Sequence, residues 1–218
     1  MKKNLTEIIF VLDESGSMGS AKSDTIGGFN EFIENQKKVK GDVKFTFVKF
    51  SDYYKIVNDG TELAHVASLN ESNYTPSFST ALRDAVGKTI DQVGNRLKNT
   101  PEDQRPEKVM FAVLTDGEEN SSKEYSQEKV FEMVKHQTDK YKWEFLFLGA
   151  DIDAWSGGSS IGFMNTVNTS KMDLKRSMKG MSNYTASYRV GADSMNLGTF
   201  NLSEEELDKQ MEELQKNK

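Results

Sequence analysis

The chain has 218 residues, enough for one domain with a sizeable core, and a formal net charge of −6. It has no cysteine and two histidines, which excludes disulfides, thiolate zinc sites and histidine-rich metal sites. The acidic balance, with no strong block of Lys and Arg, argues against nucleic acid as a partner. The apolar runs are too short to cross a membrane and the N-terminus does not read as a signal peptide, so we expect a cytoplasmic protein with no membrane partner.

Apolar strand-like runs alternate with amphipathic helical stretches over about the first 155 residues. In chain order, the pattern predicts a strand over 7–13, a helix over 25–39, strands over 43–50 and 53–57, a helix over 80–97, a strand over 108–114, a helix over 126–141 and a strand over 143–148. The more polar run over 53–57 suits an antiparallel edge strand. This order predicts an α/β fold, with a Rossmann-like, open, mostly parallel sheet and helices on both faces.

The rest of the chain has a weaker pattern. It predicts a short helix and a last strand near 165–169, a covering helix over 171–189, a loop over 191–201 and a charged helix over 203–217. A capping box, Ser203 with Glu206, opens that last helix. Only Leu207, Met211 and Leu214 form its apolar stripe, so we expect it to be peripheral. We therefore assign residues 1–200 to one domain and residues 201–218 to a C-terminal charged helix.

Three of the predicted parallel strands end in an aspartate, namely Asp13, Asp116 and Asp151. In open α/β sheets, ligands bind at the carboxyl ends of the strands. The coincidence therefore points to a binding site at that edge. For Asp151, together with Asp153, a role as ordinary turn acids is the interpretation that we favour over a role in tuning the site.

The first strand runs into an Asp-x-Ser-x-Ser turn, which places the side-chain oxygens of Asp13, Ser15 and Ser17 close together. A carboxylate with hydroxyls is a hard oxygen set that suits Mg²⁺, Mn²⁺ or Ca²⁺ rather than zinc. One carboxylate and two hydroxyls hold a dication poorly, so further ligands must come from other loops at the same edge. Thr80, before a predicted helix, and Asp116, after a predicted strand, provide them.

Together these motifs resemble the metal-ion-dependent adhesion site (MIDAS) of the von Willebrand factor A family, and the resemblance covers roughly residues 5–155. In that family an Asp-x-Ser-x-Ser turn is followed by a threonine from a middle loop and an aspartate after a later strand. The resemblance implies that the serines and, in one state, the threonine touch the metal directly, and that the aspartates act directly or through water. A vacant position then takes a carboxylate from the partner. The implied metal ligands are Asp13, Ser15, Ser17, Thr80 and Asp116.

Two departures from the family pattern matter. The family often has a glycine just before the threonine, whereas residues 77–79 here read Ser-Phe-Ser. Integrin-type members carry paired aspartates soon after the first turn, whereas residues 19–22 here read Gly-Ser-Ala-Lys, so a neighbouring calcium site is not expected. The Ser-Gly-Ser-Met form of the turn resembles bacterial or phage members.

The Asp-x-Ser-x-Ser turn also has a plain structural interpretation, because Asp and Ser cap helices for purely structural reasons. For this motif alone that interpretation is the better one. A buried strand that runs into Thr115 and Asp116, and a helix that follows Thr80, shift the balance toward a metal site.

These features predict a metal-dependent protein-binding module and not an enzyme. We expect Mg²⁺ as the usual ion, with Mn²⁺ or Ca²⁺ possible, and a protein partner that offers an Asp or Glu carboxylate. One alternative is an aspartate-dependent phosphohydrolase-like enzyme, although that class uses Asp-x-Asp where this chain has Ser15. The other is a metal-free structural or assembly protein with the same fold. The sequence leaves the partner's identity and the oligomeric state open.

Overall fold

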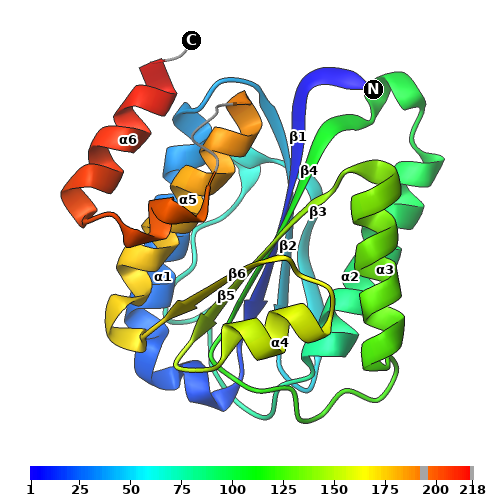
Figure 1. Ribbon diagram of the computed structural model, residues 1–218, viewed down its shortest axis with the longest axis vertical. Helices are drawn as coiled ribbons and strands as arrows, with labels where there is room; N and C mark the ends of the chain where they lie inside the picture. Colours follow the sequence, from blue (N-terminus) through cyan, green and yellow to red (C-terminus); the bar gives the residue numbers. More distant parts are fainter. Residues whose placement is uncertain (192–195, 217–218) are drawn as a thin grey trace.

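A six-stranded sheet in the order β3-β2-β1-β4-β5-β6 forms the centre of the molecule in the computed structural model, which describes residues 1–191 and 196–216 (Figure 1). The strands are β1 (Lys2–Asp13), β2 (Asp42–Phe50), β3 (Tyr54–Glu62), β4 (Pro106–Thr115), β5 (Glu144–Ala150) and β6 (Asn165–Thr169). All neighbours pair in parallel except β2 and β3, which are antiparallel. The predicted α/β sheet with one antiparallel edge strand is therefore confirmed.

Helices cover both faces of the sheet (Figure 1). They are α1 (Lys22–Lys38), α2 (Leu82–Asn99), α3 (Gln127–Tyr141), α4 (Ala154–Ser160), α5 (Leu174–Val190) and α6 (Glu204–Lys216). Short 3-10 turns join them, namely η1 (Gly16–Ala21), η2 (Leu63–His65), η3 (Glu102–Gln104), η4 (Lys171–Asp173) and η5 (Leu197–Asn201). None of the helices in the described ranges is long and apolar enough to cross a membrane.

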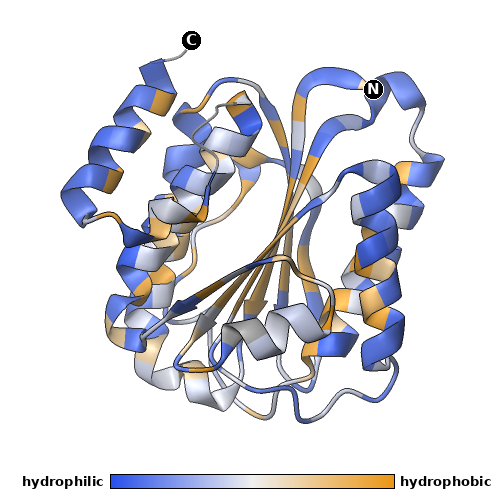
Figure 2. Cartoon of the chain, in the orientation of Figure 1, coloured by the Kyte–Doolittle hydropathy of each residue, from blue (hydrophilic) through white to orange (hydrophobic). Residues whose placement is uncertain are grey.

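The buried central strands divide the core into two clusters, because successive side chains of a strand point to opposite faces. Phe10 of β1 lies in the cluster under α1 and α5, where its ring packs edge to face on Phe29 with centroids 5.5 Å apart. Val11, the next residue, lies in the other cluster, with Val86 of α2 and Val134 of α3. Figure 2 shows the resulting apolar sheet between helices whose outer faces are polar. The core thus fixes the sheet, and the sheet fixes where its strand ends lie.

The C-terminal helix α6 docks more closely than its narrow apolar stripe predicts. Leu207, Met211 and Leu214 are all buried, and the last two pack with Val39 and Ala186. In addition, the Asn183 side-chain amide of α5 donates to the Leu207 carbonyl at 2.7 Å. The expectation of a peripheral helix is therefore wrong, because a short stripe suffices where α5 offers a matching surface (Figure 1).

The capping box at the start of α6 forms as predicted. The Ser203 amide donates to Glu206 Oε2 at 2.8 Å, and the Glu206 amide donates to Ser203 Oγ at 3.3 Å. The loop predicted over 191–201 includes residues 192–195, which lie outside the described residues, as do residues 217–218 of the predicted C-terminal segment. Within the described part, residues 197–201 form η5 and bury Phe200 against Gly180 of α5.

Candidate metal centre

The candidate ligands meet at the carboxyl edge of the sheet, which is the lower edge in Figure 1. Strand β1 ends at Asp13 and β4 ends at Thr115, and these strands are neighbours with Leu12 opposite Leu114. Asp13, at the end of β1, and Asp116, directly after β4, therefore lie close together at this edge. The turn η1 follows β1, and the loop that leads into α2 crosses beside it, since the Gly16 amide donates to the Phe78 carbonyl at 3.0 Å.

Asp13 is held rigidly at the floor of the site. It is 0% exposed, its Oδ1 accepts from the Ser15 amide at 2.7 Å, and its Oδ2 accepts from the Thr115 hydroxyl at 2.5 Å. Burial raises the pKa of Asp13 from the usual 3.8 to about 6, although both hydrogen bonds act to lower it. A nearby cation would favour the ionised form of such a carboxyl group. A metal ion bound here would therefore offset the cost of burying the ionised form of Asp13.

A chain of short polar contacts links Ser15, Ser17 and Asp116. Ser15 Oγ lies 3.1 Å from Ser17 Oγ, and Ser17 Oγ donates to Asp116 Oδ1 at 2.6 Å. Ser15 and Asp116 are buried, whereas Ser17 is exposed. The two serines therefore lie beside Asp116, although Ser17 and Asp116 are 99 residues apart in the sequence. The site opens to solvent at Ser17.

Thr80 reaches the same corner through the loop that follows β4. Its hydroxyl packs so closely on Gly117 that a Cβ at residue 117 would lie 2.5 Å from Thr80 Oγ1. Its amide donates to Asn120 Oδ1 at 2.9 Å, and its carbonyl accepts from the Asn120 amide at 3.0 Å. Thr80 is thus buried beside the residue after Asp116, which is where the sequence motifs place it.

The donor set fits a hard divalent cation. All five side chains offer oxygen, two of them as carboxylates and three as hydroxyls, which is the chemistry that Mg²⁺ and Mn²⁺ prefer. Asp116 Oδ2 is buried, and among the described residues its close partner is a single ammonium, that of Lys171 at 2.6 Å. Among those residues, no cluster of three or more His, Cys, Asp or Glu side chains could hold a metal. The hydroxyls are therefore essential to any ion held at this edge.

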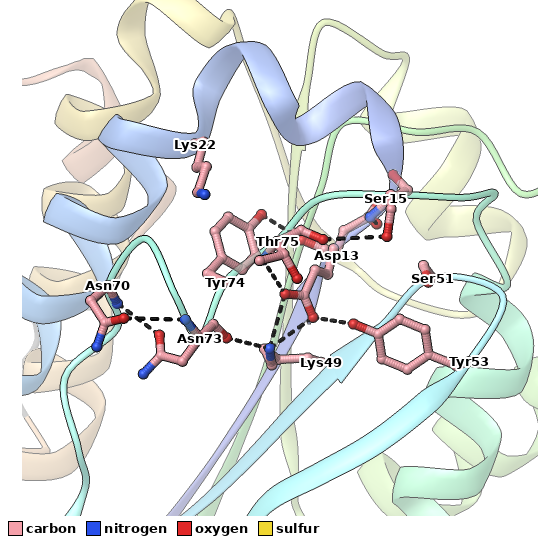
Figure 3. A network of polar contacts seen from close by, with 12 residues as sticks. Asp13, Ser15, Lys22, Lys49, Ser51, Tyr53, Asn70, Asn73, Tyr74 and Thr75 are labelled. Carbon is pink, nitrogen blue, oxygen red and sulfur yellow. Dashed lines mark hydrogen bonds and ion pairs between the residues drawn. The ribbon is translucent and has the colours of Figure 1, made fainter.

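A second, buried network lies directly behind the candidate ligands and was not predicted from the sequence (Figure 3). Its centre is Glu14, which is 0% exposed. Lys49 Nζ of β2 lies 2.9 Å from Glu14 Oε1 and 2.8 Å from Oε2. The Tyr53 hydroxyl donates to Oε2, and the Thr75 amide donates to Oε1 at 2.5 Å. The Lys49 ammonium also donates to the Asn73 carbonyl at 2.5 Å.

This Glu14 network ties two loops and strand β2 to the end of β1. Beyond its side chain, the Glu14 carbonyl accepts from the Ser77 amide at 2.8 Å and its amide donates to the Phe50 carbonyl at 2.6 Å. The hydroxyl of Tyr74, in the same loop, donates to the Asp13 carbonyl at 2.7 Å (Figure 3). Glu14 and Tyr74 thereby fix the segment that carries Thr80. A sequence signal existed, because an acid next to Asp13 and a lysine between the apolar residues Val48 and Phe50 both need partners when buried.

Lys171 of η4 is a further residue at the site that the sequence did not reveal. Its ammonium lies 2.6 Å from Asp116 Oδ2 and donates to the Ser17 carbonyl at 3.1 Å. Asp151, by contrast, accepts from the Lys171 amide at 3.2 Å, and Asp153 caps α4 by accepting from the Ser156 amide. These contacts fit the interpretation of Asp151 and Asp153 as turn acids.

Comparison with known proteins gives one family. A model of the von Willebrand factor type A domain matches residues 7–149. No curated protein sequence matches the chain. Several solved structures share the fold, at identities that carry information on the fold alone.

Proximal thread matrix protein 1 from the mussel byssus superposes with a TM-score of 0.57 at 17% identity, over 82% of this chain and 45% of that one. The chain thus spans less than half of the mussel protein. A second structure of it, described as having a zinc-occupied MIDAS motif, gives a TM-score of 0.54 at 17% identity, over 81% and 44%. The von Willebrand domain of a type V pili tip protein from Porphyromonas gingivalis gives 0.59 at 9% identity, over 88% and 97%.

Proposed function

Because this chain belongs to the von Willebrand factor type A domain family, we propose that it is a metal-dependent protein-binding module. In this proposal Asp13, Ser15, Ser17, Thr80 and Asp116 hold one divalent cation, with Mg²⁺ the usual ion and Mn²⁺ or Ca²⁺ as substitutes. The bound ion supplies a coordination position for an Asp or Glu carboxylate of a partner protein. A cytoplasmic location and a bacterial or phage origin stay predictions from the sequence.

The observation that carries the proposal is the convergence of an all-oxygen set on one strand edge that opens to solvent. Ser17 Oγ bonds to Asp116 at 2.6 Å and is exposed, while Asp13 below it is fully buried. Two carboxylates neutralise a dication without covering it, and hydroxyls add no charge. Since Mg²⁺ takes about six oxygens and keeps waters where the protein supplies none, an external carboxylate can complete its coordination.

The structure of the mussel relative described with a zinc-occupied MIDAS motif supports a metal at the same place in the fold. Zinc there does not decide the ion here, because affinity for divalent ions generally rises toward zinc and copper whatever the ion used in a cell. The oxygen-only ligands of this chain favour a harder ion.

A catalytic role for Asp13, as in the aspartate-dependent phosphohydrolase alternative, has little support. Both of its carboxylate oxygens accept hydrogen bonds, from the Ser15 amide and the Thr115 hydroxyl, and the side chain is 0% exposed. A nucleophile must reach a substrate atom, and a general base must lie within hydrogen-bond reach of one. The geometry of Asp13 suits a fixed ligand instead.

The metal-free assembly protein remains a second candidate because of one contact. The Lys171 ammonium, 2.6 Å from Asp116 Oδ2, supplies a positive charge from within the chain. Titration calorimetry with Mg²⁺ and Mn²⁺ separates the two functions. We expect one site per chain in the wild type and none in Ser15→Ala/Ser17→Ala. The matched control Ser20→Ala/Ser23→Ala removes two exposed hydroxyls from the same stretch and should bind as the wild type does. Unchanged binding in the first variant would contradict the proposed site.

The partner is tested separately, with candidates captured from the native host by the wild type in Mg²⁺. A true ligand of the site should lose binding in EDTA, regain it with Mg²⁺ or Mn²⁺, and fail to bind Ser15→Ala/Ser17→Ala while that variant keeps its circular dichroism spectrum. Equal affinity in metal and in chelator would mean that the protein binds through another face.

A further inference from the structure

Lys171 is the one cationic side chain that the described residues place in direct contact with a candidate ligand carboxylate. It comes from η4, between β6 and α5, and its Nζ reaches back to Asp116 Oδ2 at 2.6 Å and to the Ser17 carbonyl at 3.1 Å. Asp13, the other carboxylate of the set, is occupied by neutral donors, Ser15 and Thr115. The Lys171 ammonium pairs with Asp116 Oδ2, and the described residues place no neutral hydrogen-bond donor on that oxygen.

Hydrogen bonds hold the backbone around Lys171 in a position from which its side chain reaches Asp116. Its amide donates to Asp151 Oδ1 at 3.2 Å, and Asp151 itself has a left-handed backbone with φ of 56°. The Asp151 amide donates to the Thr169 carbonyl at 2.8 Å, which ties the end of β6 to the end of β5. Ser170 caps η4 by accepting from the Asp173 amide at 3.1 Å. A side chain at residue 171 therefore starts beside the site, and a lysine is long enough to enter it.

Charge sets how Lys171 responds to an arriving divalent ion. A dication held at Asp116 and the nearby ammonium are both positively charged, so they repel each other, and salt screens this repulsion less in a partly buried site than at an open surface. The ammonium also occupies the space beside Asp116 Oδ2, so an ion bound through that oxygen would have to displace it. Lys171 is a quarter exposed and flexible along its four-carbon stem, so its head can leave for solvent without a change of the backbone.

We propose that Lys171 is a tethered competitor of the metal: its ammonium neutralises Asp116 in the metal-free protein and must be displaced when the divalent ion binds. This inference rests on the proposed metal site and adds how that site is regulated. The lysine lowers metal affinity and thus raises the ion concentration at which the module becomes able to take a partner carboxylate. It also keeps the site from carrying two uncompensated buried carboxylates when the ion is absent.

The test is the Mg²⁺ and Mn²⁺ affinity of Lys171→Met, which keeps an unbranched side chain one atom shorter and removes its charge. We expect binding at least about tenfold tighter than in the wild type, which corresponds to about 1.4 kcal/mol, and a larger rise in Tm on addition of metal. Lys171→Arg, which keeps the charge, should bind no more tightly than the wild type. The matched control is Lys22→Met, which removes a lysine of similar exposure that pairs with Glu71 at 2.7 Å. That variant should resemble the wild type.

The outcomes separate this inference from the proposed function. Metal binding by Lys171→Met but not by the wild type would support the inference most strongly. Equal affinities of the wild type and Lys171→Met at one site per chain would overturn it and leave the proposed function standing. An equal gain in Lys22→Met and Lys171→Met would also overturn it, because the effect would then be one of net charge. No binding by any variant would overturn both.

Discussion

Two fully buried glutamates lie in and directly after strand β1, and their networks join different parts of the molecule. Glu7, midway along the strand, accepts from the Arg96 guanidinium of α2, with Nη2 2.7 Å from Oε1, and from the Thr46 hydroxyl at 2.6 Å. Glu14, just past the end of the strand, pairs with Lys49 and receives donors from Tyr53 and Thr75. Glu7 therefore joins a helix to the sheet, whereas Glu14 joins loops to one another around Asp13.

The difference teaches that burial of an acid does not by itself indicate a functional role. Both glutamates are satisfied by a cation and neutral donors, and removing either cation would leave a buried charge. What differs is what each cation holds, because Arg96 lies on a packed helix, whereas the Lys49 ammonium also donates to the Asn73 carbonyl in the loop before α2. A helix packed along its length keeps its place without one ion pair, but a loop held mainly by hydrogen bonds does not. The Glu14 network should therefore control the site, and the Glu7 pair should control stability alone.

The largest expected effect is on stability when each cation is removed. Breaking a buried ion pair costs about 3–5 kcal/mol, because the remaining charge is uncompensated. Lys49→Met should reach that range in urea unfolding measured in chelator. Arg96→Met should fall at its lower end, since the Arg96 side chain is 26% exposed and water can reach the carboxylate. A loss below about 1 kcal/mol in Lys49→Met would show that Glu14 is stabilised mainly by Tyr53 and Thr75.

A second expected effect, on metal affinity, separates the two pairs more sharply. Glu14→Gln/Lys49→Met and Glu7→Gln/Arg96→Met each remove one negative and one positive charge, so the net charge near the site is unchanged. We expect the first double variant to bind Mg²⁺ about tenfold more weakly, a loss of about 1.4 kcal/mol, because the loop before Thr80 is released. The second should bind within about twofold of the wild type. Calorimetry checks both, and equal losses would contradict the separate roles.

Phe78 tests how firmly Glu14 holds that loop. Its φ is 67°, a left-handed conformation that costs a non-glycine residue about 1–2 kcal/mol, and its side chain is 71% exposed. Phe78→Gly should therefore leave stability unchanged or raise it by up to about 1 kcal/mol. A thermal melt in chelator measures this. Destabilisation by more than about 1 kcal/mol would show that the phenyl ring packs in solution and that the loop owes its shape to that packing.

The smallest expected effect concerns Glu144, an acid that pairs with no Lys or Arg in the ranges that the structure describes. The Tyr184 hydroxyl donates to Oε1 at 2.6 Å and the Asn165 amide at 2.7 Å, and burial raises the pKa of Glu144 above its usual 4.5. The folded state thus holds this proton to a higher pH than the unfolded state. Its contribution to stability is therefore lost as the pH rises from about 4.5 through the raised pKa.

Glu144→Gln should flatten that slope, because the glutamine side chain binds no proton over this window. The measurement is the difference between the stability curves of the variant and the wild type from about pH 4 to 8. An identical slope in Glu144→Gln would contradict the assignment.

The sequence predicted the sheet well because its central strands must be apolar on both faces. The predicted run over 43–50 became β2 with one residue added, and the segment near 165–169 became β6 without change. The errors lie at the polar ends of strands, where the predicted strands were too short. Strand β1 begins at Lys2 and β3 extends to Glu62, because backbone pairing with a neighbouring strand continues whatever side chains the chain carries there. The alternation of apolar and polar side chains therefore does not indicate how far such pairing extends.

The part of the site that lies at the ends of neighbouring strands could be predicted from the sequence. The five candidate ligands come to one edge because β1 and β4 are neighbours, which the order of strands and motifs implies. Lys49 and Glu14 were missed because their contact depends on the register that sets Asp13 opposite Phe50. Lys171 was missed because it reaches Asp116 from a short turn whose position depends on β6, Asp151 and Ser170 together.

The two outer strands of the sheet have a consequence for how the molecule behaves among copies of itself. A free strand edge is a template on which another chain can add. The pairing of β3 with β2 is irregular, with register shifts between Phe45 and Val48 of β2. Charged residues such as Lys55 and Asp59 also lie along β3. Strand β6 is only 5 residues long, polar, and packed against α4 (Figure 1). Neither edge offers a long, flat, apolar row of unpaired amides, so the folded chain is poorly suited to seed intermolecular β-sheet at high concentration.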